Sequence, residues 1–152
     1  MPTITIKLFR ITPDFDIPLP TRATEGASGF DLRAAVRSPL RLLPGMIELV
    51  PTGVGLIIPP GLEGQVRPRS GLAIRHGITV LNSPGTIDSD YRGEIGVILV
   101  NHGQEPYIIS RGERIAQLVI MPVMQVIWEE VFESQFVKTD RGPSGFGSTG
   151  SL

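Results

Sequence analysis

The stretch that decides the fold is residues 78–100, which read ITVLNSPGTIDSDYRGEIGVILV. Apolar, strand-like runs stand at its two ends, over residues 78–81 and 95–100, and a polar segment that contains Pro84 and Gly85 separates them. A Pro-Gly pair favours a chain reversal, and two apolar runs around such a segment are typical of a β-hairpin. We therefore predict a hairpin with an irregular polar tip over residues 78–100.

The tip of this predicted hairpin carries three side chains that can recognise or act on a ligand: Asn82, Asp88 and Tyr91. The amide of Asn82 can donate and accept hydrogen bonds at once. The carboxylate of Asp88 could orient or deprotonate a water molecule, and the ring of Tyr91 could lie against a flat or sugar-like ligand. The tip is thus interpreted as a reader of a small polar ring beside a hydrolytic carboxylate.

The rest of the chain reads as an all-β protein with many turns. Its 18 glycines and 14 prolines are spread evenly and divide the sequence into short segments. One short helical turn is expected over residues 70–77, with Ser70 as its N-cap and Gly77 as its terminator. Further strands are predicted over residues 3–8, 47–50, 54–58, 64–67, 115–121 and 125–132.

Length and composition narrow the class of protein. A chain of 152 residues fits one domain with a core of its own, and no apolar run reaches the length of a membrane span. The net charge of −1 disfavours broad binding to nucleic acid or to an anionic membrane. The N-terminus reads as a first strand rather than a signal peptide. The absence of cysteine excludes thiol chemistry and suits a cytoplasmic protein.

The last segment, residues 139–152, is too rich in glycine and serine to hold itself folded. We therefore divide the chain into a β domain over residues 1–138 and a glycine-rich segment over residues 139–152. A flexible, disordered tail is one interpretation. The other is a mobile lid that orders over a ligand, because Phe146 stands alone between glycines as a stacking group and Arg141 could pair with a phosphate.

Four further polar residues could serve a phosphorylated ligand or the fold itself. Asp31 stands in an apolar strand and could lie near a phosphate-bound metal or hold a loop. Arg69 and Ser70 precede backbone N–H groups at the expected helix start, either as a small anion site or as a plain cap. Gln117 lies among apolar residues, so a structural hydrogen bond or a phosphate could satisfy its amide.

A dedicated protein metal site is not expected. His76 and His102 are isolated and there is no cysteine pair, so the spacing of a zinc site is missing. A metal would most naturally arrive on the phosphates of the substrate, and Mg²⁺ fits that role because it needs few protein ligands.

Taken together and in this order, these segments resemble the homotrimeric dUTP pyrophosphatase (dUTPase) family. Five short patterns match, from Ala27 to Gly150, and the long run from Leu81 to Glu94 is one of them. The resemblance implies a distorted β-barrel or jelly-roll-like subunit, assembled as a homotrimer with active sites shared between chains. It implies hydrolysis of dUTP to dUMP and pyrophosphate with Mg²⁺, which keeps uracil out of DNA and supplies dUMP for thymidylate synthesis.

The resemblance also implies a role for individual residues. Asp88 would orient the attacking water, Tyr91 would stack beneath the deoxyribose, and Asp31 would touch the metal through water. Uracil would be read by the Asn82 side chain and by the backbone along Thr86, Ile87, Asp88 and Gly96. The phosphates would be held by Arg69, Ser70, Gly71 and Gln117. In the lid, the substrate would meet Arg141, Phe146, Gly147, Ser148 and Thr149.

Gly96 departs from the family pattern, in which larger side chains are common at this position, so only its backbone is available for contact. Two rival functions stay open from the sequence. One is the related dCTP deaminase, built on a similar fold; the other is a nucleotide-binding or signalling module without chemistry. Asp88 argues against the module, because pure binding does not require that carboxylate.

Overall fold

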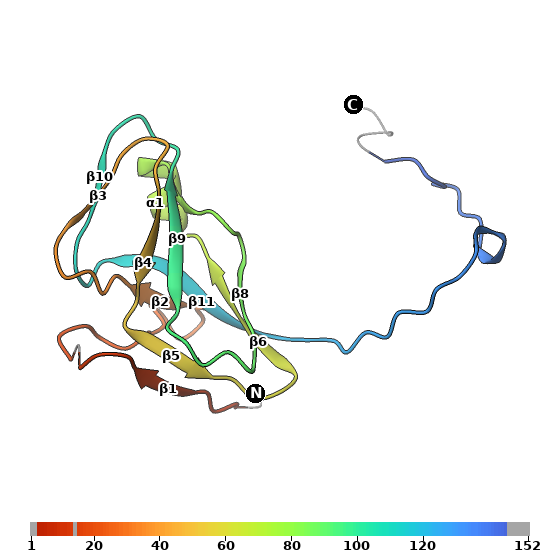
Figure 1. Ribbon diagram of the computed structural model, residues 1–152, viewed down its shortest axis with the longest axis horizontal. Coiled ribbons are helices and arrows are strands. Elements are labelled where there is room, and N and C mark those ends of the chain that lie inside the picture. Colours follow the sequence, from red (N-terminus) through yellow and green to blue (C-terminus); the bar gives the residue numbers. More distant parts are fainter. Residues whose placement is uncertain (1–2, 14, 146–152) are drawn as a thin grey trace.

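The computed structural model describes residues 3–13 and 15–145 (Figure 1). Within these residues the chain is built almost wholly from short strands, as the sequence predicts, with one α-helix and one 3-10 turn. The helix is α1 (Ser70–His76) and the 3-10 turn is η1 (Glu133–Gln135). The strands are β1 (Lys7–Arg10), β2 (Phe30–Arg33), β3 (Leu40–Leu42), β4 (Ile47–Pro51), β5 (Val54–Ile57), β6 (Leu62–Arg67), β7 (Ile78–Val80), β8 (Gly85–Ile87), β9 (Gly96–Asn101), β10 (Tyr107–Ile109) and β11 (Arg114–Pro122).

The strands form four antiparallel sheets, with the orders β1-β5, β10-β3, β2-β11-β6-β8 and β4-β9-β7. None of these sheets closes into a barrel within the described residues, although together they enclose one core. The strand predicted at the N-terminus begins later than expected, at Lys7, where pairing with β5 starts. A strand needs a hydrogen-bonded neighbour, so its bounds follow the pairing rather than the alternation.

The hairpin predicted from residues 78–100 is present, because β7 pairs with β9 in the register Ile78↔Asn101 to Val80↔Leu99. Its tip is more ordered than the sequence indicates. Within the tip, β8 pairs not with the hairpin's own strands but with β6 of the neighbouring sheet, from Gly64↔Ile87 to Val66↔Gly85. The tip therefore bridges two sheets, and the chain turns toward β8 through a cis peptide bond at Ser83-Pro84.

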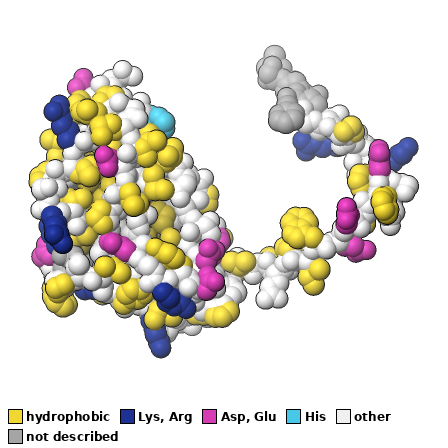
Figure 2. All heavy atoms as spheres, in the orientation of Figure 1, with side chains coloured by type: hydrophobic (Ala, Val, Ile, Leu, Met, Phe, Trp, Pro, Cys, Tyr) yellow, Lys and Arg dark blue, Asp and Glu magenta, His cyan; other side chains and the backbone are white. Residues whose placement is uncertain are grey.

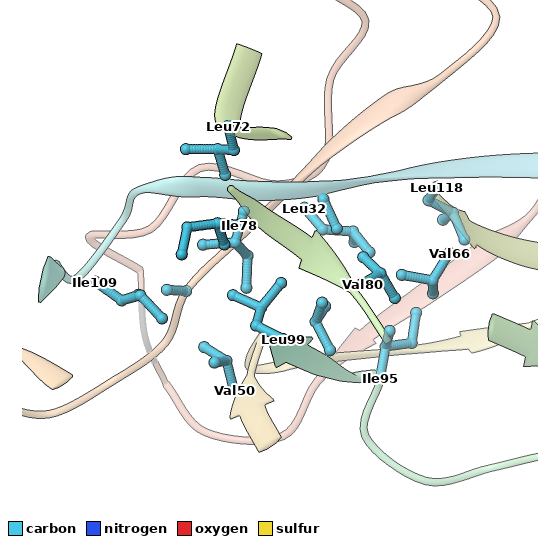
Figure 3. Packing of buried hydrophobic residues seen from close by; sticks show 14 of the residues in the cluster. Leu32, Val50, Val66, Leu72, Ile78, Val80, Ile95, Leu99, Ile109 and Leu118 are labelled. Carbon is cyan, nitrogen blue, oxygen red and sulfur yellow. The ribbon is translucent and has the colours of Figure 1, made fainter. Parts of the chain in front are cut away.

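Aliphatic side chains from all four sheets fill the space between them (Figure 3). Val50, Val80, Ile95 and Leu99 are almost completely buried and point into this core from β4, β7, the hairpin tip and β9, respectively. Burial of each such side chain stabilises the fold by about 1.5–3 kcal/mol before the entropy cost is counted. The core thus holds β4, β7 and β9 rigidly behind the hairpin tip.

The helix α1 ends as predicted but begins one residue earlier than expected. Gly77 caps its C-terminus with a left-handed φ of 68°, and its N–H donates to the carbonyl of Ala73. The prediction that Ser70 is the N-cap is wrong: Arg69 holds that position in extended conformation, and no side chain caps the helix there. Ser70 is already the first helical residue, so its hydroxyl is free of the capping role.

Residues 123–145, hereafter the arm, leave the body after β11 and extend away from it (Figure 1). The strand predicted over residues 125–132 is wrong: this stretch holds no strand. Its apolar side chains lie open to solvent instead, with exposed fractions of 84% for Met124, 94% for Ile127 and 92% for Trp128 (Figure 2). The alternation is present in the sequence, but none of the described strands lies beside the arm to pair with it.

Candidate active site

A cavity of about 410 Å³ opens at the tip of the hairpin, between β4, β8 and β9. This volume lies within the range of small-molecule sites. The lining residues come from five strands and from the loops that join β7 to β8 and β8 to β9. They are Leu49, Pro51, Val66, Val80, Asn82, Gly85, Thr86, Ile87, Asp88, Tyr91, Glu94, Gly96 and Ile98. We call this space the hairpin cavity.

Six residues that sequence analysis names as substrate-binding share this one cavity: Asn82, Thr86, Ile87, Asp88, Tyr91 and Gly96. They come together because β8 is drawn onto β6 while β9 stays paired with β4 and β7, so the tip stands apart from β9. The carboxylate of Asp88 lies at the rim, exposed to solvent, where a bound water could reach it.

Hydrogen bonds fix the shape of the tip. The phenol of Tyr91 donates to the carbonyl of Glu94 at 2.8 Å, and the Tyr91 N–H donates to the carbonyl of Asp88 at 3.2 Å. The Glu94 carboxylate in turn accepts from the N–H of Gly53 at 2.7 Å, which anchors the tip on the turn between β4 and β5. Asp88 and Tyr91 are therefore held in a set relation to each other rather than on a loose loop.

Close packing inside the tip depends on Gly85. A Cβ built on Gly85 would stand 3.1 Å from Nδ2 of Asn82, so the Asn82 amide lies directly over the glycine. A side chain at position 85 would force the amide to shift by a few tenths of an ångström. Asn82 is exposed and lines the cavity, so its amide is presented to a ligand.

A second, smaller cavity of about 250 Å³ lies beside α1 and is rich in cationic side chains. Its lining includes two of the predicted phosphate-binding residues, Arg69 and Gly71, and shares no residue with the hairpin cavity. The remaining lining residues are Leu72, Arg75, His76 and Arg114. Three guanidinium groups around one hollow make this the more suitable place for a phosphate chain.

The carboxylate of Asp31 organises the guanidinium groups from behind this second cavity. It is 6% exposed and lies 3.3 Å from Nε of Arg69 and 3.2 Å from Nη1 of Arg114. Arg69 also donates from Nη1 to the backbone carbonyl of Arg114 at 3.0 Å. One buried anion therefore holds two arginines that lie 45 positions apart in the sequence.

Two other predicted phosphate ligands lie near this group without lining either cavity. Gln117 is half-buried on β11, opposite Asp31 in the pairing of β11 with β2. Its side chain packs on Gly29, where a built Cβ would stand 3.2 Å from the Cβ of Gln117. Ser70 is exposed at the first turn of α1.

The tail contributes one described residue to the predicted site. Arg141 is exposed, and its Nε donates to the carbonyl of Ser144 at 3.0 Å, within the arm itself. The structure does not bring Arg141 to either cavity of the same chain. The other predicted lid residues, Phe146, Gly147, Ser148 and Thr149, lie outside the described residues.

Sequence analysis missed several residues of the two cavities. Leu49, Pro51, Val80 and Ile98 read as ordinary strand residues, and nothing in a strand's alternation tells which apolar side chain meets a cavity. The role of Arg114 could not be predicted either, because its ion pair with Asp31 depends on the register of β2 and β11.

Two kinds of feature are absent from the described parts of the chain. No group of three or more His, Cys, Asp or Glu side chains is placed there so that it could hold a metal ion. Nor does any helix among these residues have both the length and the apolar character needed to cross a membrane.

Comparisons with known proteins agree on one family. A family model described as dUTPase matches residues 16–150. The chain is 60% identical to the deoxyuridine 5'-triphosphate nucleotidohydrolase of Anaeromyxobacter sp. over 134 residues, 88% of each protein. It is 55% identical to that of Methylocella silvestris over 150 residues, 97% of this chain and 92% of the relative. The structure of the Staphylococcus bacteriophage 80alpha dUTPase with dUPNHPP matches 97% of this chain and 99% of its own, at 27% identity and a TM-score of 0.85. With these matches over most of its length, the chain belongs to the dUTPase family.

Proposed function

We propose that this protein hydrolyses dUTP to dUMP and pyrophosphate, and so keeps uracil out of DNA and supplies dUMP for thymidylate synthesis. The observation that carries the proposal is the hairpin cavity, in which Asn82, Asp88 and Tyr91 line one space. Family membership supports the substrate, and the cavity supplies a reader for a polar ring next to a free carboxylate.

The hairpin cavity suits the nucleoside end of the substrate. Its charged lining residues are Asp88 and Glu94, both acidic, so it would repel a phosphate chain and accept an uncharged base and sugar. The Asn82 amide can pair with the imide edge of uracil, aided by backbone groups of β8. Cytosine would leave buried donors and acceptors unpaired, which gives steep base selection. The ring of Tyr91 forms the floor for the deoxyribose.

Asp88 is the proposed catalytic residue. Its carboxylate lies at the rim of the hairpin cavity, where the α-phosphate of a bound dUTP would emerge. There it accepts a hydrogen bond from a water molecule and aims the water's oxygen at the α-phosphorus, in line with the departing pyrophosphate. The bond from phosphorus to the bridging oxygen breaks as the new P–O bond forms, so no covalent enzyme intermediate is needed.

The proposed phosphate ligands are Arg69, Ser70, Gly71 and Gln117. Arg69 and Gly71 line the cationic cavity, whose guanidinium groups would neutralise the pyrophosphate oxygens. This cavity and the hairpin cavity share no lining residue. We therefore propose that a complete site joins the hairpin of one chain to the cationic cavity of another, in a homotrimer.

The arm is consistent with such an assembly. Its apolar side chains are exposed along an extended segment, and the described residues of the same chain leave them open. A second copy is the natural cover for this surface, because exposed apolar stretches of that size mark contact surfaces. We propose that the arm carries the tail to a neighbouring chain, where Arg141, Phe146, Gly147, Ser148 and Thr149 close over the nucleotide.

Mg²⁺ is the proposed cofactor, brought to the site on the substrate's phosphates. The donor set of the described residues fits this arrangement: they offer no ready-made metal cage, and Asp31 is already paired with two arginines. Asp31 would therefore reach the ion through water rather than directly. When bound, Mg²⁺ adds positive charge that stabilises the pyrophosphate leaving group.

A nucleotide panel with pyrophosphate detection, run with and without a chelator, tests the proposal. We expect pyrophosphate from dUTP far faster than from dCTP, dTTP or UTP, and loss of the activity with EDTA that Mg²⁺ restores. Rapid ammonia release from dCTP would instead identify a deaminase. Tight nucleotide binding without any product would identify a binding module.

The role of Asp88 is tested by Asp88→Asn, which keeps the shape and removes the charge. We expect turnover to fall by roughly 10²- to 10⁴-fold with little change in the binding of dUMP. Glu105→Gln is the matched control, because it makes the same chemical change on an exposed loop away from both cavities. Undiminished pyrophosphate release by Asp88→Asn would show that the assigned role is wrong.

A further inference from the structure

Leu49 is a large apolar residue that lies exposed on the surface of its own chain. It lies on β4 with 64% of its surface exposed, yet it lines the hairpin cavity beside Asn82, Asp88 and Tyr91. Ile47, two residues earlier on the same strand, is exposed to a similar extent, 54%, and does not line the cavity. The two side chains lie on the same face of β4 with similar exposure, and of the two only Leu49 reaches the cavity.

The side chain of Leu49 lies over Gly96 of the neighbouring strand β9. In the pairing of β4 with β9, Leu49 stands opposite Ile98 and Pro51 stands opposite Gly96. Side chains two apart on a strand share a face, so Leu49 and Gly96 are diagonal neighbours on the face that bounds the cavity. A Cβ built on Gly96 would stand 2.6 Å from Cδ1 of Leu49.

That distance shows that Leu49 occupies the space that a side chain at position 96 would take. Glycine at position 96 leaves space for the Leu49 side chain. It is not required by the backbone conformation, because Gly96 is not among the glycines with positive φ. The wall of the cavity at this point is therefore formed by Leu49 of β4, whose side chain extends over Gly96 of β9.

We propose that Leu49 is a further substrate-contact residue, whose isobutyl group, seated over Gly96, forms the apolar wall against which the pyrimidine ring packs. The inference rests on the proposed function, since it takes the base of dUTP as the occupant of the hairpin cavity. The cavity's chemistry agrees, because its lining includes the apolar side chains of Leu49, Val80 and Ile98. A flat ring with one apolar face fits that wall.

The test compares Leu49→Ala with Ile47→Ala in steady-state dUTP hydrolysis. We expect Leu49→Ala to raise KM about five- to tenfold, the effect of removing roughly 40–60 Å² of apolar contact. Its kcat should stay within about twofold of wild type, because the wall contacts the base equally before and during the reaction. Ile47→Ala should leave both constants within about twofold.

A second pair of variants tests the contact between Leu49 and Gly96. Gly96→Ala should also raise KM, because its methyl group displaces the flexible end of Leu49 from the wall. In the double variant, Leu49→Ala with Gly96→Ala, the new methyl stands in the vacated space. We therefore expect the double variant to have a lower KM than Leu49→Ala alone, a clear departure from additivity.

Melting temperature and size-exclusion elution of every variant separate this role from a structural one. Equal KM values for Leu49→Ala and Ile47→Ala, or additive effects in the double variant, would overturn the inference. So would an altered oligomeric state of Leu49→Ala, which would place the side chain in a subunit interface. In each of these cases the proposed function still holds if the wild-type protein hydrolyses dUTP. If the wild-type protein releases no pyrophosphate, both the proposed function and the role of Leu49 are wrong.

Discussion

Nε of Arg69 lies 3.3 Å from Oδ1 of Asp31, and this ion pair ties the N-cap residue of α1 to strand β2. The second oxygen of the same carboxylate accepts a hydrogen bond from Nη1 of Arg114 at 3.2 Å. A single buried acid thereby sets the orientation of two cations around the cavity that we assign to the phosphates.

Replacement of Asp31 by asparagine should weaken both the fold and the site. The change keeps the volume but leaves Arg69 and Arg114 without their counter-charge, which destabilises the protein by about 1–3 kcal/mol, since both arginines keep partial access to solvent. We also expect a higher KM for dUTP, because the two guanidinium groups lose their common anchor. Urea unfolding and steady-state kinetics measure the two effects.

Asp16→Asn is the matched control for Asp31→Asn. Asp16 also pairs with an arginine, Arg111, at 2.7 Å, but this pair lies at the surface, far more open to water. The hydrogen bond from Arg111 holds the pKa of Asp16 below its ordinary value, so any stability from this pair is lost only as pH falls through that lowered pKa. Asp16→Asn should cost clearly less stability and leave KM unchanged. Equal losses for the two variants would contradict a special role for Asp31.

The two asparagines of the chain should respond in opposite ways to replacement by alanine. Asn101 is fully buried; its amide donates to the carbonyls of Leu42 and Glu105, each at 2.9 Å, and its oxygen accepts from the N–H of Gly103. Asn101→Ala should therefore cost about 2–4 kcal/mol of unfolding free energy. Asn82→Ala, in the exposed tip, should retain the stability and lose dUTP turnover. Chemical denaturation and pyrophosphate release distinguish the pair.

Tyr107 should resist ionisation in the native protein. Burial, followed by the hydrogen bond to the Glu113 carboxylate and its negative charge, raises the pKa of Tyr107 well above its ordinary value. Since the folded pKa is raised, the stability from this phenol is complete at neutral pH and declines once pH rises above about 10, where the unfolded chain ionises.

An alkaline absorbance titration of Tyr91→Phe checks this, because the variant leaves Tyr107 as the remaining tyrosine of the two in the chain. The absorbance of tyrosinate should appear only as the protein unfolds in base, and circular dichroism monitors that unfolding. Tyr107→Phe is the complementary variant. A native-state titration of Tyr91→Phe centred near pH 10 would refute the assigned environment.

Removal of residues 139–152 should lower dUTP turnover far more than it lowers the melting temperature. The described part of this segment, residues 139–145, is exposed or nearly so and makes its hydrogen bonds within the arm, so the core loses nothing when it is removed. The proposed lid, by contrast, loses every residue that would cover the nucleotide. Differential scanning calorimetry and steady-state kinetics on the shortened chain measure the two effects. Comparable losses of melting temperature and turnover would show that the segment has a structural role.

The sequence by itself determined the features that depend on local chemistry. The apolar runs on either side of the Pro84-Gly85 turn predicted the hairpin, and Gly77 marked the end of the helix, because each depends on a few neighbouring residues. The order of the polar motifs led to the dUTPase family, which the comparisons confirm. Asn82, Asp88 and Tyr91 could be proposed together because one hairpin tip carries all three.

Tertiary structure alone decided which segments meet. Alternation shows that a segment has an apolar face, but it does not name the partner strand. For that reason the pairing of β8 with β6, the lack of a strand over residues 125–132 and the position of Leu49 over Gly96 could not be predicted. Likewise, Asp31 and Arg114 are 83 positions apart, and only the register of β2 with β11 brings their charges together. Local preferences act over a few residues, whereas pairing and packing join residues that the chain keeps far apart.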